Sequence, residues 1–188
     1  MKFTTWRTCI ICIIAVGISN LSNAFDVHLT EKQMKEASEY GSKYKGKEVF
    51  GSDIVKKARF GEYPNGDGGI IMSKYIRIAV TSAMMALKDK IPTPDDLKEI
   101  EESTTFNVVV SVLDEDVNVL EDVQIIVKQG TNNILPIKTE FGMKYKDKRQ
   151  GIVGVFQCEK VNPNASTAIV VKTRKGEKKY KIDFSDIR

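Results

Sequence analysis

Residues 167–184 read TAIVVKTRKGEKKYKIDF, and this stretch decides the fold class. In its second half, Tyr180, Ile182 and Phe184 alternate with charged side chains. Successive side chains of a strand point to opposite faces, so the alternation indicates a half-buried antiparallel strand. A polar turn at residues 174–177 separates it from the apolar run before it, which predicts a β-hairpin.

The same kind of segment recurs through the second half of the chain, where short Val- and Ile-rich runs are separated by polar turn residues. The expected strands are 106–113, 123–128, 134–141, 152–158, 167–173 and 178–184. Short strands at this spacing favour a sandwich or an open barrel over a parallel sheet. For residues 105–188 we therefore predict an antiparallel β-sandwich of about six or seven strands, immunoglobulin-like in outline.

Residues 25–104 carry the signals of helices instead. Thr30 is placed to cap a helix over residues 31–44, and Gln33 completes a capping box. Thr93 is placed to cap another helix, because a proline and two aspartates follow it. We predict an α+β fold in which this N-terminal helical region packs on the sandwich.

A buried helix is expected between these two, since apolar side chains recur at helical spacing from Tyr75 to Ala86, and residues 69–72 before it could form a brief strand. Within it, Met84 and Met85 are interpreted as core filling, and binding of a soft metal or an adaptable binding surface is the alternative. The Gly-rich residues 63–69 lack the spacing of a phosphate-binding loop, and no strand is evident before them, so they predict a plain turn.

The N-terminus has the three-part layout of a secretory signal peptide, predicted at residues 1–24. Lys2 and Arg7 precede a short apolar run, and small residues follow at 22–24. The run is about half of the roughly 20 residues that cross a bilayer, so we expect no permanent membrane span after cleavage and a periplasmic or secreted protein. Cleavage leaves 164 residues and lowers the net charge from +4 to +2, which argues against a nucleic-acid partner.

Cleavage also leaves Cys158 as the one cysteine, so no internal disulfide can form. We interpret Cys158 as a buried strand residue, with a reactive thiol as the alternative. One cysteine and one histidine, His28, cannot build a structural zinc cluster, and we expect no cofactor. A hydrolytic triad would have to use His28 near a mobile chain end, so no catalytic residue is assigned.

The loop over residues 114–122 is acidic. Its oxygen ligands Asp114, Asp116 and Asn118 are weak candidates for calcium, which takes six to eight oxygens. The loop lacks the central glycine of an EF-hand, and acidic loops between strands occur without any ion. We therefore predict no metal site.

The final hairpin is basic and forms the tentative partner-binding site. Its cations are Lys172, Arg174, Lys175, Lys178, Lys179 and Lys181, and a second basic turn carries Lys144, Lys146, Lys148 and Arg149. On one side of the molecule they would form a patch for an anionic partner. The alternative is a Lys-rich solvated edge that prevents aggregation of the sheet.

Residues 70–79 (IIMSKYIRIA), 162–165 (NPNA) and 182–185 (IDFS) resemble segments of uncharacterised bacterial exported proteins and lipoproteins. This sequence departs from them at Lys74, where proline is expected, and in having no lipidated cysteine. The resemblance covers about the last two thirds of the chain and implies an exported protein with a helical front and a β-rich back.

We therefore expect an exported, non-enzymatic protein that binds another component of the cell envelope, either a protein or an anionic polymer, through the basic hairpin. The alternative is a small periplasmic hydrolase or ligand-binding protein. Its pocket would lie between the helices and the sandwich, a common position for concave sites.

Overall fold

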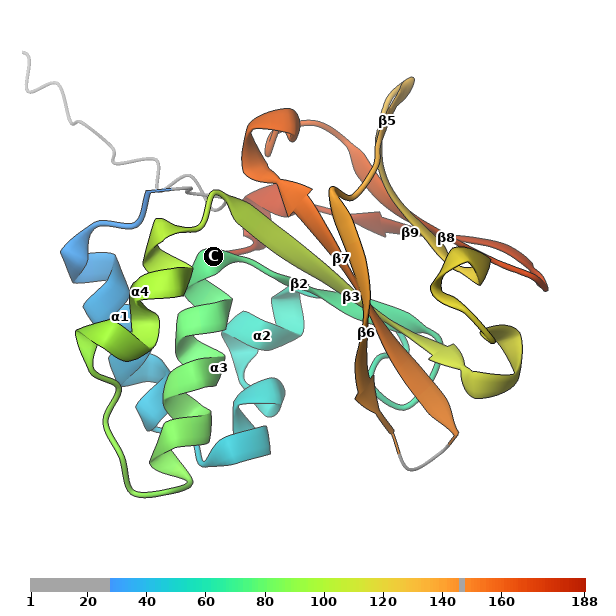
Figure 1. The fold of residues 1–188 in the computed structure, drawn as a ribbon. Helices are drawn as coiled ribbons and strands as arrows, with labels where there is room; N and C mark the ends of the chain where they lie inside the picture. The colour runs from blue at the N-terminus through green and yellow to red at the C-terminus, as the bar shows by residue number, and fades with distance from the viewer. Residues whose placement is uncertain (1–27, 146–147) are drawn as a thin grey trace, which may run out of the picture.

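The computed structural model of the chain describes residues 28–145 and 148–188 (Figure 1). The predicted signal peptide at residues 1–24 lies outside them. The helices are α1 (Glu31–Ser42), η1 (Gly46–Gly51), α2 (Asp53–Lys57), α3 (Lys74–Ala86) and α4 (Pro94–Glu102), and the short 3-10 turns are η2 (Asp114–Asp116), η3 (Leu120–Asp122), η4 (Cys158–Lys160) and η5 (Phe184–Asp186). No helix in the described ranges is long and apolar enough to cross a bilayer.

The described strands form two antiparallel sheets, which confirms a mixed helix-and-sheet fold. They are β1 (Arg59–Gly61), β2 (Gly68–Met72), β3 (Thr105–Leu113), β4 (Gln124–Gln129), β5 (Asn132–Ile134), β6 (Lys138–Lys144), β7 (Arg149–Gln157), β8 (Thr167–Thr173) and β9 (Gly176–Ile182). A five-stranded sheet has the order β1-β2-β3-β7-β6, and a four-stranded sheet has the order β5-β4-β8-β9 (Figure 1).

The prediction of one strand over residues 134–141 is wrong. The chain forms β5 and β6 there, and they belong to different sheets, because β5 pairs with β4 and β6 pairs with β7. Pro136 lies between the two strands. Proline has no N–H to donate to a strand ladder, so it suits the crossing from one sheet to the other.

The five-stranded sheet begins within the N-terminal region, before residue 105. β2 confirms the brief strand expected at residues 69–72 and pairs with β3 from Gly68 to Met72, whereas β1 was not expected. The expected boundary between residues 104 and 105 therefore falls between two paired strands of one sheet. β1 is three residues long, too short for an alternation of apolar and polar side chains to stand out in the sequence.

The predicted helix caps are confirmed. Thr30 Oγ1 accepts the Gln33 N–H at 3.2 Å, and the Thr30 N–H donates to Gln33 Oε1 at 2.8 Å. Thr93 forms the same reciprocal pair with Asp96 at the start of α4. Each cap satisfies N–H groups that the first turn of a helix cannot pair internally, so local sequence determines where α1 and α4 begin.

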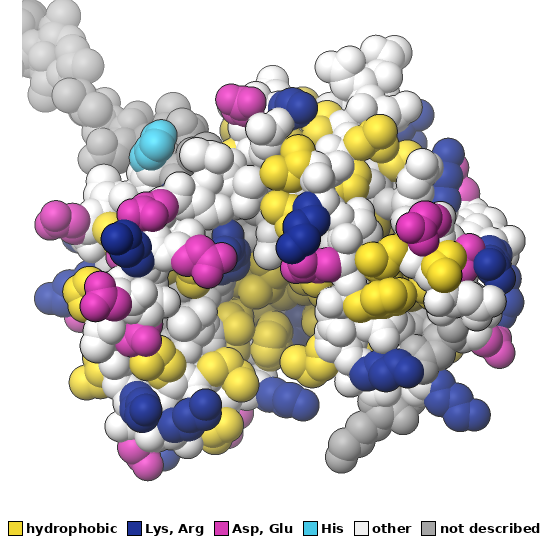
Figure 2. Space-filling model, viewed as in Figure 1, with side chains coloured by type: hydrophobic (Ala, Val, Ile, Leu, Met, Phe, Trp, Pro, Cys, Tyr) yellow, Lys and Arg dark blue, Asp and Glu magenta, His cyan; other side chains and the backbone are white. Residues whose placement is uncertain are grey.

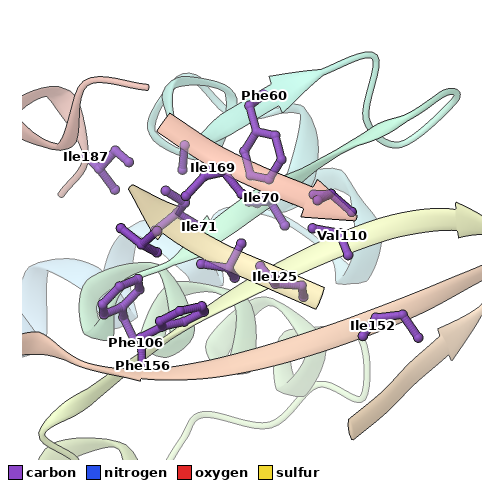
Figure 3. Close-up of a cluster of buried hydrophobic side chains, with 14 of the residues drawn as sticks. Phe60, Ile70, Ile71, Phe106, Val110, Ile125, Ile152, Phe156, Ile169 and Ile187 are labelled. Atoms are coloured by element: carbon purple, nitrogen blue, oxygen red, sulfur yellow. The ribbon is translucent and has the colours of Figure 1, made fainter. Parts of the chain in front are cut away.

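The two sheets share one hydrophobic core (Figure 3). The rings of Phe106 on β3 and Phe156 on β7 stack with centroids 5.4 Å apart. Phe184, just after β9, meets Phe106 edge-on at 5.8 Å. All three side chains are fully buried. This aromatic cluster therefore joins the five-stranded sheet to the segment that follows the four-stranded sheet.

A glycine lets α1 lie close to α3. A Cβ atom built on Gly41 would stand 2.0 Å from the carbonyl oxygen of Ala79, far inside any allowed contact. Ala37 and Ala79 are also buried without measurable exposure. Small side chains at these positions bring the two helix backbones together, so α1 packs on α3.

We expect Gly41→Ala to destabilise the protein. Overpacking a buried contact costs about 1–3 kcal/mol or more, and the gain in helix propensity from glycine to alanine is only about 1 kcal/mol. Urea unfolding should show a net loss on the order of 2 kcal/mol. Gly51→Ala is the matched control, because nothing lies within 4 Å of its added Cβ; equal stability of the two variants would contradict this account.

Candidate functional site

The predicted basic hairpin is present as β8 and β9, and its cations fall on two faces. Lys179 and Lys181 are exposed, whereas Tyr180 and Ile182 between them are half-buried. The alternation predicted for this strand is therefore confirmed. Lys178 shares the strand face of Tyr180, so it points toward the five-stranded sheet and not away from the molecule.

The acidic loop lies against this hairpin, and the two neutralise each other. Arg174 Nε lies 2.7 Å from Asp122 Oδ1. Lys175 Nζ lies 2.6 Å from Glu115 Oε1 and 2.7 Å from Asp116 Oδ1. Asp116 and Glu115 raise the pKa of Lys175, so the ammonium stays charged. The tip of the hairpin is thus not a free cationic surface.

Two of the three calcium candidates have contacts within the described residues. Asp116 binds the Lys175 ammonium, and the Asn118 N–H donates to Asp122 Oδ2 at 2.9 Å. Asp114 lies in η2, and its side chain lies outside the description. Among the described residues, no three His, Cys, Asp or Glu side chains form a group that could hold a metal ion.

Asp67 connects three segments that are far apart in the sequence. Its carboxylate accepts a hydrogen bond from Lys178 on β9 and another from Arg149 Nη1 on β7 at 2.7 Å. These hydrogen bonds, that of Lys178 first, lower the pKa of Asp67. The two basic stretches of the sequence therefore meet at one carboxylate, which lies in the turn between β1 and β2. Lys146 of the second stretch lies outside the described residues.

Few hairpin cations are left for a partner. Lys172 lies 3.3 Å from Glu177 on the neighbouring strand, so each of four cations has an acidic partner. Among the described side chains, Lys179 and Lys181 are the hairpin cations without an ion pair. Two separate lysines on an edge strand are typical of a solvated edge.

A different concave surface lies between the helices and the five-stranded sheet. We call it the interlayer groove. Its volume is about 560 Å³, and its lining residues are Lys47, Phe50, Tyr63, Pro64, Asn65, Val80, Met84, Met143 and Tyr145. Figure 2 shows it as a hollow with hydrophobic side chains on its floor. This volume is within the range of about 300–1,000 Å³ typical of ligand sites.

Three parts of the fold position this lining. Val80 and Met84 lie one turn apart on α3, so they share a face of the helix. Met143 and Tyr145 come from the end of β6 and the turn after it. The third part is the turn predicted at residues 63–69. It is confirmed for residues 63–67, where the Glu62 N–H donates to the Asp67 carbonyl at 2.8 Å, but Gly68 and Gly69 belong to β2.

Two tyrosines place polar groups in this apolar surface. The hydroxyl groups of Tyr63 and Tyr145 lie 3.1 Å apart, and their rings meet edge to face with centroids 6.3 Å apart. Burial raises the pKa of Tyr63, so its phenol stays protonated at neutral pH. The pair joins two aromatic rings that follow the two edge strands, β1 and β6, of the five-stranded sheet, and it places both residues on the groove lining.

The interpretation of Met84 as core filling is wrong. Met84 is 41% exposed and lines the groove together with Met143, which is 59% exposed. The helical spacing of the segment that holds Met84 and Met85 favoured core filling, but it could not show that nothing covers Met84. Tyr63 and Tyr145 were not identified at all, because they are 82 positions apart and no local pattern links them.

The two residues considered for nucleophilic or acid–base chemistry, Cys158 and His28, are not part of the groove lining. Cys158 begins η4 and is partly buried. Burial raises its pKa to about 11, so the thiol stays protonated and poorly nucleophilic at neutral pH. His28 is exposed at the start of the described chain.

We expect Asp67→Asn to lower the free energy of unfolding by about 1 kcal/mol at pH 7, a value discounted for the partial exposure of this carboxylate. The folded-state pKa of Asp67 is lowered, so its contribution is complete above the unfolded value of about 4 and is lost as the pH falls through the folded value. Unfolding curves measured from pH 7 to pH 2 should show the free energies of unfolding of wild type and Asp67→Asn converging as the pH falls. In the control Glu115→Gln, where the carboxylate is 71% exposed, stability should change by less than about 0.5 kcal/mol; a constant gap between wild type and Asp67→Asn at all pH values would refute the assignment.

Comparisons with protein-family models, curated proteins and solved structures found no match to this chain. The resemblance to exported bacterial proteins stays a prediction. The candidate site therefore depends on its own geometry: an apolar groove with two phenols, one amide and one ammonium group on its lining.

Proposed function

We propose that this protein is an exported, non-enzymatic binding protein of the bacterial cell envelope, and that an apolar part of its ligand occupies the interlayer groove. One observation carries the proposal: Met84 and Met143 line the same apolar hollow, from α3 and β6, and both remain exposed to solvent. A folded chain gains free energy by covering such side chains, and a ligand can supply that cover.

The composition of the lining favours binding. Apolar burial contributes about 25 cal/mol per Å², so a ligand that covers the methionines, Phe50 and Val80 gains affinity without any charge. Methionine adapts its shape to different surfaces. The hydrogen-bonded pair of Tyr63 and Tyr145 supplies a rigid end with polar groups that can orient the ligand.

The groove is a better candidate than the basic hairpin. Four hairpin cations are held by acidic side chains of the same molecule, so binding an anionic polymer there would first require breaking those ion pairs. The groove needs no such rearrangement, because its apolar side chains are already in place. It also lies where the alternative hypothesis expects a pocket, between the helices and the sheet.

Export is proposed from the sequence alone. The basic start, the short apolar run and the small residues at 22–24 are typical of a cleaved signal peptide, and a periplasmic or secreted location follows from it. We also propose an immunoglobulin-like sandwich for the β-rich part, supported by two antiparallel sheets with a common core.

A charge placed in the groove should abolish ligand binding. We expect Met84→Glu to weaken binding of the neutral fluorescent probe N-phenylnaphthylamine at least tenfold, because a carboxylate would be desolvated beneath the bound probe. Probe titration followed by fluorescence measures the dissociation constant.

The matched control is Ile91→Glu. Ile91 is 82% exposed in the connection between α3 and α4, outside the groove lining, so the change removes an exposed apolar side chain and adds the same charge. Its affinity should stay within twofold of wild type, an allowance for a minor change in free energy. Equal loss in both variants, or no probe binding to wild type, would refute the groove as a binding site.

A further inference from the structure

The groove has a single charged side chain among its described lining residues. Lys47 comes from η1 and is exposed, and no described residue forms an ion pair with it. Lys175 and Lys178 line a different concave surface, and both of them have acidic partners. A lone ammonium beside an apolar surface is the arrangement that attracts a negatively charged group.

Polar groups elsewhere on the lining are neutral. Asn65 contributes an amide, and Tyr63 and Tyr145 contribute phenol hydroxyl groups that are hydrogen-bonded to each other. These groups can orient a ligand by hydrogen bonds but do not select its charge. The charge preference of the groove is therefore set by Lys47.

We infer that the ligand is a free, single-chain amphiphile with one carboxylate. Its head group pairs with Lys47, and its apolar chain lies between Val80 and Met84 of α3 and Met143 of β6. The groove volume of about 560 Å³ suits one such chain. Because this inference rests on the proposed function, its test separates binding of the chain from recognition of the head group.

The test uses the exported protein and the neutral fluorescent probe as reporter. Dodecanoate, dodecanol and dodecyltrimethylammonium, each below its micelle concentration, compete with the probe. The three share one chain and differ in head-group charge. Dodecanoate should displace the probe at a concentration about tenfold lower than the other two, and this advantage should decrease as salt is added.

Variants of one residue isolate the head-group contact. Lys47→Gln should lower the affinity for dodecanoate about tenfold and leave the affinity for the neutral probe within twofold of wild type. Lys47→Arg should retain both affinities. Lys179→Gln is the matched control, because it removes an exposed lysine without an ion pair among the described residues, on the outer side of β9. It should change neither affinity.

Four other results would each contradict a specific part of the inference. Equal affinity for dodecanoate and dodecanol, or no effect of Lys47→Gln on dodecanoate binding, would refute recognition of the carboxylate. The groove would then be a binding site for apolar ligands of any head-group charge. If the probe did not bind to the wild-type protein, both the proposed binding function of the groove and the inferred ligand would be refuted. A dimer that Met84→Glu dissociates would assign the groove to a second copy. Co-sedimentation with vesicles of anionic phospholipid, without dodecanoate binding, would replace the free ligand by a membrane surface.

Discussion

The structure depends on one constraint: the five-stranded sheet has two apolar faces, and both must be covered. Register pairs Ile71 with Val108 and Val108 with Gly154 on one face. It pairs Ile70 with Val109 and Val109 with Val153 on the other. The four-stranded sheet covers the first face, where the aromatic cluster lies, and leaves a smaller hollow of about 220 Å³ beside Val110 and Val112.

The second face is covered unevenly, and the interlayer groove is the result. Ile70 is buried in the same cluster as side chains of α2 and α3. Farther across the sheet, Val109 and Val153 are only half-buried. The helical layer ends before the sheet does, so the side chains at its border stay open to solvent. Met84 and Met143 mark the two sides of this border.

Charged side chains of the β1–β2 turn, the acidic loop and the basic hairpin also stabilise the fold. Asp67 accepts hydrogen bonds from Arg149 of one sheet and Lys178 of the other, while the acidic loop after β3 binds the tip of the hairpin. Both contacts link the two sheets where their edges meet water. Ion pairs between partly exposed side chains contribute modestly to stability, but they fix how neighbouring segments lie. The basic composition of the hairpin thus reflects its acidic neighbours within the same chain.

The sequence by itself determined the elements whose signals are local. Alternation in β9 and the capping residues Thr30 and Thr93 each act within a few positions, so the hairpin and the starts of α1 and α4 were predictable. Only the tertiary structure decided that residues 134–141 divide between two sheets, that β1 and β2 join β3, and which charges pair. It also decided where Met84 lies relative to solvent. These features depend on contacts between residues far apart in the chain, and a local pattern carries no information about what covers a side chain from outside its own segment.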